Sequence, residues 1–406
     1  MLNQEFNVKN LLYLTTIKDI IKFKLGKKRE DYQKNLEAAV ETINSDHFSF
    51  QDLGKIETDK RSIFVCNKTE SHYALKKISD NLVRLYRVKF SNRFDISSQV
   101  LTLLKETSDF YIIRTDIKSF YESVERERLI KSINDKRLLS YKCRKLLTVL
   151  FNHKSLTSEK GLPPGLSISA PLSEIYLEDF DRQIRSIPQV YFYARYVDDL
   201  IIFCSSNHEQ VIKTINEKLS EVNLNINKKK TSFRHFKNCN SNIENLADSF
   251  EFLGYKYSES KTPAGQERSI SISLSEKRIR RIKTRIVLAI LDYKKNSDYE
   301  LLLDRIKFLT SNFSLFKNNE SSNLKAGIYY SYILINQYDQ LKSLDNFLRK
   351  LINTKKGPGS ALAILHATRK GKLTANSFLI GHRFRKEFIF DKNKFSKIVK
   401  CWKNEN

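Results

Sequence analysis

Two adjacent aspartates between apolar runs constrain this chain more than any other feature. Asp198 and Asp199 separate the apolar-aromatic run 191–196 from the apolar run 200–204. Two such runs joined by a tight link predict an antiparallel hairpin with the carboxylates at its tip. Like charges in an apolar setting repel unless something compensates them. Taken alone, the pair is explained equally well by an exposed Asp-Asp turn, which is common in hairpins.

A third aspartate follows another apolar run. Residues 111–113 are Tyr-Ile-Ile and lead to Asp116, a pattern that predicts a buried strand ending at an acid. Two strands of one sheet would bring Asp116 to the Asp198–Asp199 pair. Carboxylate oxygens suit Mg²⁺, which keeps room for water and phosphate. Such a cluster can hold two metal ions about 3.5–4 Å apart for in-line displacement at phosphorus.

The overall charge favours a polyanionic partner. The 406 residues include 72 Lys and Arg against 46 Asp and Glu, a formal net charge of +26. An excess of this size favours nucleic acid as the partner, with solubility alone as the alternative interpretation. The hydrophobic fraction of 40% is enough to fill a core and excludes a mostly disordered chain. No stretch of about 20 apolar residues occurs and the five cysteines form no Cys-x-x-Cys pair, so a cytoplasmic protein with no membrane partner is expected.

Hydrophobic periodicity divides the chain into regions. Apolar residues at helical spacing predict a helical N-terminal extension over residues 1–75. Alternating strands and helices follow up to about residue 260, with a charged helical stretch over about 125–150, helices over about 168–184 and 208–222, and a strand pair around 250–257. From residue 275 onward the chain is expected to be wholly helical. Isoleucines mark one face of 276–291 and Lys and Arg fill the rest, which predicts a helix that binds a nucleic-acid backbone. A solvated helix face is the alternative.

Five segments, in order along the chain, carry further patterns. They are Thr115–Tyr121, with an aromatic residue five positions after the acid; Gly161–Ser169, Gly-Leu-Pro-Pro-Gly-Leu-Ser-Ile-Ser; Tyr196–Asp199, Tyr-Val-Asp-Asp; Leu224–Thr231, Leu-Asn-Ile-Asn-Lys-Lys-Lys-Thr; and Phe252–Gly254, Phe-Leu-Gly. Together they resemble the ordered motifs of the reverse transcriptase family. A single Tyr-x-Asp-Asp is weak, but five ordered motifs within about 140 residues are a specific signal.

The resemblance implies a right-hand polymerase fold of the α+β class. Fingers and palm with an antiparallel sheet would occupy residues 76–260. A helical thumb would follow over 261–345, and a basic helical C-terminal segment over 346–406. The helical extension 1–75 would precede them.

The resemblance also implies catalytic roles. Asp116, Asp198 and Asp199, with the backbone carbonyl of Ile117, would hold two Mg²⁺ ions, with Mn²⁺ as the alternative ion. Lys230 would act at the triphosphate as a general acid or charge stabiliser, unless it is one lysine of a solvated run.

Substrate contacts are expected around the same centre. Tyr121 falls at the steric-gate position, where an aromatic ring excludes a ribose 2′-OH; a core tyrosine is the alternative. Gly165 would let the backbone approach the base pair, or is a simple turn glycine. Pro164 stands where the family has Gln, which alters the contacts of that loop. The other expected nucleotide-binding residues are Phe120, Arg87 and Arg93. Nucleic-acid binding is expected of Phe252, Leu253, Gly254, Lys277, Arg278, Arg281 and Arg285.

The subfamily is indicated by shorter strings. Residues 85–88, 111–116 and 117–124 look like the defence-associated (Unknown Group and abortive-infection) class of bacterial reverse transcriptases. This resemblance implies an RNA-directed DNA polymerase in anti-phage defence, with a dedicated non-coding RNA template, dNTP substrates and a DNA product. A second reverse transcriptase or a second copy of the chain would be the protein partner. The alternatives are a retron-type enzyme, a template-independent or protein-primed polymerase, and a catalytically idle RNA-binding scaffold.

Overall fold

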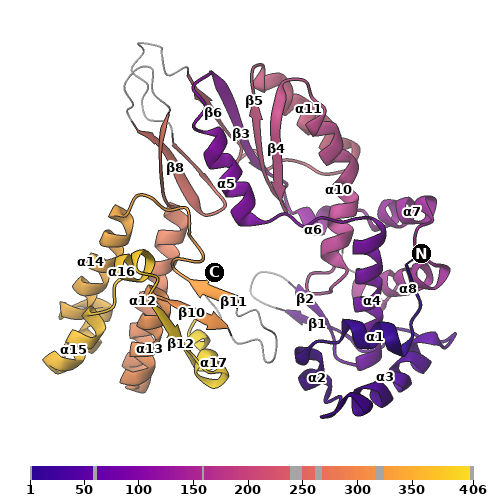
Figure 1. Cartoon of the computed structure of the whole chain (residues 1–406), viewed down its shortest axis with the longest axis horizontal. Helices are drawn as coiled ribbons and strands as arrows, with labels where there is room; N and C mark the ends of the chain where they lie inside the picture. The colour runs from indigo at the N-terminus through magenta and orange to yellow at the C-terminus, as the bar shows by residue number, and fades with distance from the viewer. Residues whose placement is uncertain are drawn as a thin grey trace. The chain divides into compact units, whose positions relative to one another are not determined.

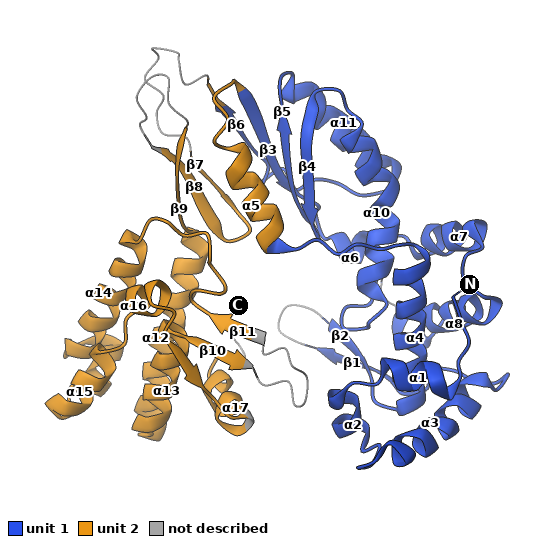
Figure 2. Cartoon of the chain, in the orientation of Figure 1, with its two compact units in different colours: residues 1–93, 110–235 blue, residues 94–109, 236–406 orange. Residues whose placement is uncertain are grey.

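The chain forms two compact units in a computed structural model. The structure describes residues 2–57, 62–157, 160–237, 249–260, 268–315 and 324–402. Unit 1 comprises residues 1–93 and 110–235, and unit 2 comprises residues 94–109 and 236–406 (Figure 2). The domain boundaries expected at residues 75, 260 and 345 stay predictions.

Unit 1 begins with helices that are interrupted by a two-stranded hairpin. The elements are α1 (Val8–Leu14), α2 (Ile17–Phe23), α3 (Arg29–Asn44), β1 (Leu53–Glu57), β2 (Ser62–Cys66) and α4 (Thr69–Leu85). β1 and β2 pair antiparallel, with Leu53 opposite Cys66. The helical extension predicted over residues 1–75 did not include this hairpin. Each strand has five residues, too few for periodicity to distinguish a strand from a helix.

A four-stranded sheet forms the centre of unit 1 (Figure 1). In sheet order its strands are β4 (Val190–Tyr196), β5 (Asp199–Cys204), β3 (Phe110–Asp116) and β6 (Ser232–Phe236). The hairpin predicted from the apolar runs is confirmed, since β4 and β5 pair antiparallel. Helices α10 (Ser169–Arg185) and α11 (His208–Glu221) contact β4 and β3 respectively, and also contact each other. Every residue of β5 after Asp199 is buried, so this strand is the most protected part of the sheet.

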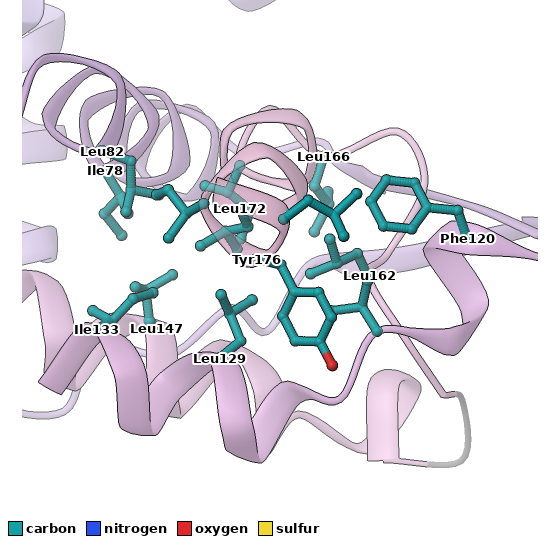
Figure 3. Close-up of a cluster of buried hydrophobic side chains, with 14 of the residues drawn as sticks. Ile78, Leu82, Phe120, Leu129, Ile133, Leu147, Leu162, Leu166, Leu172 and Tyr176 are labelled. Carbon is teal, nitrogen blue, oxygen red and sulfur yellow. The ribbon is translucent and has the colours of Figure 1, made fainter. Parts of the chain in front are cut away.

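A helical core adjoins the sheet. It includes α6 (Phe120–Ser123), α7 (Arg126–Lys136), α8 (Tyr141–Phe151) and α9 (Lys154–Thr157). Figure 3 shows Leu129 and Ile133 of α7 and Leu147 of α8 in one buried cluster with Ile78 of α4 and Leu172 of α10. The single charged helical stretch expected near residues 125–150 is thus two helices. α7 ends at Arg137 in the left-handed region, and the Ser140 side chain accepts from the backbone N–H of Cys143 to cap α8.

Unit 2 contains two small sheets and a set of helices. Its elements are α5 (Arg93–Leu103), β7 (Ser249–Phe252), β8 (Tyr255–Ser260), β9 (Ser269–Leu274), α12 (Glu276–Asn296), α13 (Tyr299–Thr310), β10 (Asn312–Leu315), β11 (Leu324–Gly327), α14 (Asp339–Asn353), the 3₁₀ helix η1 (Gly357–Leu362), α15 (Ala367–Thr374), α16 (Phe378–Arg383), β12 (Glu387–Ile389) and α17 (Lys392–Lys400). The predicted strand pair near residues 250–257 is confirmed as β7 and β8.

The expectation that the chain is wholly helical after residue 275 is wrong. β10 pairs antiparallel with β11 and parallel with β12. The buried Asn312 side chain fixes this sheet, because its amide donates to the carbonyl of Gly381 at 2.9 Å and its oxygen accepts from the N–H of Tyr329 at 2.8 Å. These partners lie far from Asn312 in sequence, so local periodicity carries no sign of them. Among the described helices, none combines the length and the apolar character that a membrane span requires.

Candidate active site

The β3–β5 ladder places two of the predicted metal ligands opposite each other. Asp116 is the last residue of β3 and pairs in register with Asp199, the first residue of β5. Residues opposite each other in an antiparallel pair have Cβ atoms about 4.5–5.5 Å apart. Asp198 lies in the turn before β5, and its carbonyl accepts from the backbone N–H of Ile117 at 3.0 Å. The backbone therefore brings the three aspartates and Ile117 to one end of the sheet.

The segment Leu224–Thr231 lies against this end of β3. The backbone N–H of Lys118 donates to the carbonyl of Asn225 at 2.8 Å, and the N–H of Asn227 donates to the carbonyl of Asp116 at 2.8 Å. These bonds place Lys230 beside the carboxylates. Its ammonium donates to Oδ2 of Asp116, while its side chain keeps 59% of its surface exposed.

The two oxygens of the Asp116 carboxylate differ. Oδ2 accepts from Lys230, whereas Oδ1 is buried and has no hydrogen-bond partner among the described residues. A buried acceptor without a partner is rare in folded proteins, and a bound ion is one way to satisfy it. The Asp116 carboxylate therefore has one oxygen suited to a cation.

Burial and mutual repulsion act on the other two carboxylates. Burial raises the pKa of Asp198, and the charge of Asp116 adds to the increase, while Lys230 opposes it. Burial also raises the pKa of Asp199, with further contributions from Asp198 and Asp116 and opposition from Arg114. The hydrogen bond to Asp116 raises the pKa of Lys230. The folded chain thus holds these carboxylates in an environment that penalises their charge.

A pocket of about 790 Å³ opens beside the carboxylates. Eight of the predicted residues line it: Asp116, Ile117, Phe120, Tyr121, Pro164, Gly165, Asp198 and Lys230. Asp199, Arg87 and Arg93 are not among the described residues in its wall. The sequence analysis did not anticipate the remaining lining residues, which are Ile63, Lys118, Ser119, Glu122, Val197 and Asn227.

The Gly161–Gly165 loop is held from two sides. The N–H of Leu162 donates to the carbonyl of Tyr121 at 2.7 Å, and the carbonyl of Pro164 accepts from the N–H of Phe64 in β2 at 2.7 Å. Gly165 has φ +97°, and a Cβ there would lie 2.6 Å from the carbonyl oxygen of Phe64. Only glycine fits this position without a shift of β2. The loop is thereby clamped between α6 and β2.

Tyr121 is half-buried at the start of α6, and its ring packs edge-to-face on the buried Phe120 with centroids 5.6 Å apart. Tyr121 and Phe120 both line the pocket, and Tyr121 also packs against the hydrophobic core of unit 1. Its role as a steric gate stays a prediction. Arg87 follows α4 with φ +51°, and Arg93 begins α5.

The remaining predicted residues lie in unit 2. Leu253 and Gly254 form the two-residue turn between β7 and β8, with φ +45° and +84°, the pattern of a type I′ hairpin turn. Phe252 is buried. On α12, Lys277 and Arg281 are exposed and Arg278 is half-buried. The Arg285 guanidinium lies 5.5 Å from the ring centroid of Trp402, which follows α17 in the chain. Arg285 therefore packs against an aromatic ring.

The residues at the end of β3 fit a divalent cation in their chemistry. Three carboxylates and a backbone carbonyl are the hard oxygen donors that Mg²⁺ and Mn²⁺ prefer, and Asp116 Oδ1 has no other partner among the described residues. In the part of the chain that the structure describes, no three acidic, His or Cys side chains already converge as metal ligands. Lys230 donates to the other oxygen of Asp116, Oδ2, and leaves Oδ1 for a cation.

Comparison with known proteins agrees with this geometry. Residues 27–257 match the family described as "Reverse transcriptase (RNA-dependent DNA polymerase)", which is more than half of the chain. The chain belongs to the reverse transcriptase family. Its α+β fold is accordingly that of a right-hand polymerase, as expected from the ordered motifs.

A similar solved structure is that of apo telomerase from Candida Tropicalis truncated from the C-terminal domain. It is 15% identical, with a TM-score of 0.39, and the match covers 57% of this chain and 56% of that one. This reverse transcriptase therefore spans little more than half the length of that chain. No curated protein sequence matches it.

A buried ion-pair network supports the aspartate hairpin of this reverse transcriptase. Arg195 of β4 is buried, and its Nη2 donates to Asp181 and Glu174 of α10, each at 2.7 Å. Its Nη1 donates to the carbonyl of Val197 at 2.9 Å. Val197 has φ +59°, an uncommon conformation for a β-branched residue that requires support. The network therefore ties the strained turn before Asp198 to α10.

The sequence analysis missed Arg195. Its only sequence signal is a cation inside an apolar strand, and its partners lie 14 and 21 positions earlier on α10. The bonds to Asp181 outweigh the effect of burial and raise the pKa of Arg195. Its charge is therefore retained throughout the pH range in which the protein is folded.

We predict that Arg195→Met lowers the free energy of unfolding by about 3–5 kcal/mol, because it leaves the buried Asp181 and the partly buried Glu174 without their cation. Urea denaturation of purified protein measures this change. Arg182→Met is the matched control, since Arg182 lies on α10 with 73% of its side chain exposed and pairs only with Asp179. The control is expected to change stability by less than about 1 kcal/mol. Equal losses in the two variants would contradict a supporting role for Arg195.

We also predict that Asp198→Asn stabilises the metal-free protein at pH 7. The folded-state pKa of Asp198 is raised, so the wild type loses stability as the pH rises from the unfolded pKa through the folded one. The variant lacks this loss. Thermal unfolding in chelator should show a higher midpoint for the variant by a few degrees at pH 7, with the difference shrinking as the pH falls toward about 4. Asp46→Asn, at a side chain 91% exposed, should show no such trend.

Proposed function

We propose that this chain is an RNA-directed DNA polymerase that adds dNTPs to a DNA strand on a bound RNA template. One observation carries the proposal: Asp116 and Asp199 pair across β3 and β5, with Asp198 beside them at a pocket of nucleotide size. Membership of the reverse transcriptase family agrees with it. The reaction is phosphoryl transfer, in which positioning and charge stabilisation supply most of the catalysis.

Asp116, Asp198, Asp199 and the carbonyl of Ile117 would hold two Mg²⁺ ions, with Mn²⁺ as the alternative. When bound, the ions supply Lewis-acid stabilisation of the charge that develops at phosphorus. Lys230 has a separate task. Its ammonium is largely exposed and lines the pocket, so once released from Asp116 it can donate to the leaving phosphate.

The pocket wall suits a deoxynucleotide. Tyr121 faces the pocket and is supported by Phe120, so its ring can exclude a ribose 2′-OH. Gly165 and Pro164 offer a backbone surface without a bulky side chain, held in place by β2. A base pair stacked on this loop would meet rigid backbone, which favours a fixed position for the incoming nucleotide.

Unit 2 would hold the primer and the product duplex. We assign Phe252, Leu253 and Gly254 to a primer grip on the β7–β8 turn. The exposed Lys277 and Arg281 and the half-buried Arg278 of α12 would neutralise backbone phosphates, giving an affinity that falls with salt and does not depend on sequence. Arg285 would contribute mainly through its packing on Trp402.

We place the polymerase in the bacterial, defence-associated class, in the cytoplasm. The strings at residues 85–88, 111–116 and 117–124 support this assignment. In this role the template is a dedicated non-coding RNA, and the protein partner is a second reverse transcriptase or a second copy of the chain.

The test is to purify the chain from cells with its genomic neighbourhood intact and sequence the co-purifying nucleic acid, for wild type and Asp198→Asn side by side. One discrete RNA with complementary DNA, and no DNA in the variant, would support the proposal. DNA that lacks a complement in the RNA but depends on Asp198 would indicate untemplated or protein-primed synthesis. RNA alone in both samples, during phage infection as well, would indicate an idle scaffold and contradict the proposal.

We predict that Asp198→Asn lowers DNA synthesis on a primed RNA template at least about 1000-fold, because it removes a metal ligand that acts as one unit with Asp116 and Asp199. Incorporation of labelled dNTPs with Mg²⁺ measures the change. Asp46→Asn should retain wild-type activity. RNA affinity should be unchanged in both variants, which separates loss of chemistry from loss of template.

We predict that Tyr121→Ala relaxes sugar discrimination. Removing the ring should raise the efficiency of ribonucleotide incorporation relative to deoxynucleotide incorporation by about 10- to 100-fold, since the clash with the 2′-OH disappears. Tyr121→Phe keeps the ring and should retain the wild-type ratio. Single-nucleotide incorporation kinetics with matched dNTP and rNTP give the two efficiencies. An unchanged ratio in Tyr121→Ala would remove Tyr121 from the steric-gate role.

A further inference from the structure

Unit 1 has a second pocket whose lining shares no residue with the catalytic one. It lies between α7 and α8, has a volume of about 690 Å³, and is lined by Asn134, Asp135, Arg137, Tyr141, Arg144, Lys145, Thr148 and Val149. Residues 126–145 contain eight Lys and Arg against two acids. The catalytic mechanism uses none of these residues.

The cations of this pocket are available to an anion. Arg137 and Arg144 form no ion pair with any described residue, and the Nε of Arg144 is buried without a hydrogen-bond partner among them. Within the described residues, the one ion pair of Lys145 is a 3.9 Å contact with the exposed Asp46. The single acid of the lining is Asp135. Arginine binds phosphate through a fork of N–H donors that matches two of its oxygens.

An exposed aromatic ring stands at the same pocket. Tyr141 is the first residue of α8, and 73% of it is exposed. Exposed aromatic rings beside arginines provide stacking surfaces for unpaired bases. A ring and free guanidiniums at one pocket match the two parts of a nucleotide, its base and its phosphate.

The pocket is preformed. Beneath it, Leu129, Ile133 and Leu147 belong to the buried cluster of Figure 3, which fixes α7 against α8. The Gln4 side chain braces the connecting segment, since its Nε2 donates to the carbonyl of Leu138 at 3.0 Å and its Oε1 accepts from the N–H of Ser140 at 2.6 Å. A ligand would therefore meet positioned groups with little ordering of the backbone.

We infer that the pocket between α7 and α8 is a second RNA-binding site, in which a base of single-stranded RNA stacks on Tyr141 and its phosphates contact Arg137 and Arg144. The lining also offers acceptors, the carboxylate of Asp135 and the amide oxygen of Asn134, which suit a ribose 2′-OH and favour RNA over DNA. The inference rests on the proposed function in that the ligand is the RNA that the polymerase copies. This site would anchor that RNA away from the point of synthesis.

The test measures binding of a fluorescein-labelled 20-nucleotide single-stranded RNA by anisotropy, without metal ions or nucleotides. Tyr141→Ala should weaken binding about 10-fold, the effect of losing one stacked base. Tyr13→Ala is the control, because Tyr13 is 79% exposed elsewhere in unit 1. Arg137→Asn should lower the slope of log affinity against log salt by about 0.7, one phosphate contact. Lys24→Asn is its control, a cation at the end of α2 with a similar φ of +50°.

The outcomes separate this inference from the proposed function. An idle scaffold would make no DNA yet still lose RNA affinity in Tyr141→Ala, because the binding assay requires no catalysis. Photo-crosslinking of 5-iodouridine RNA to the peptide that contains Tyr141 would support the site independently of any variant. Wild-type affinity in both Tyr141→Ala and Arg137→Asn would overturn the inference. Two other results would overturn the assignment to single-stranded RNA. In one, the two variants lose as much affinity for single-stranded DNA of the same sequence; in the other, they lose affinity only for duplex RNA.

Discussion

Unit 1 holds like charges together at one end of a sheet, and much of its structure compensates for their repulsion. Asp116 lies opposite Asp199, a cross-strand pairing that destabilises a sheet when both residues are charged. The buried apolar residues of β3 and β5 hold the two strands together despite this repulsion. Arg195 donates to the carbonyl of Val197 and so supports the turn before Asp198. Lys230 donates to Asp116 and so offsets part of the negative charge of the carboxylates. The cluster of carboxylates thus lowers the stability of the folded chain, as is common at functional sites.

The elements that sequence could predict are those with local causes. The β4–β5 hairpin followed from two apolar runs around a short polar link, and the α10 and α11 helices from apolar spacing. The meeting of Asp116 with Asp198 and Asp199 required only that two buried strands share a sheet. The roles proposed for Tyr121 and Gly165 come from the resemblance of the five motifs, because no periodicity indicates which side chains would face a nucleotide. Eight of the site residues predicted from these motifs line one pocket.

What sequence could not predict depends on partners distant in the chain. β1 and β2 are short, and one of the bonds that connect β2 to the rest of unit 1 runs from the N–H of Phe64 to the carbonyl of Pro164, 100 residues later. The β10–β12 sheet depends on Asn312 bonding to Gly381. Arg195 looked like an interruption of an apolar strand, and only the structure shows two carboxylates of α10 around it. The pocket between α7 and α8 is lined by residues of both helices, and composition does not indicate that they meet there.

The hydrogen bond between Phe64 of β2 and the Pro164 carbonyl limits how far the chain could be shortened from its N-terminus. All three aspartates, Lys230 and the glycine loop lie after residue 110. A fragment that began at residue 76 would keep each of them but would lose Ile63 from the pocket wall and leave the Pro164 carbonyl without its donor. The N-terminal hairpin is therefore part of the polymerase core rather than an appendage, and modules fused to this chain belong before it.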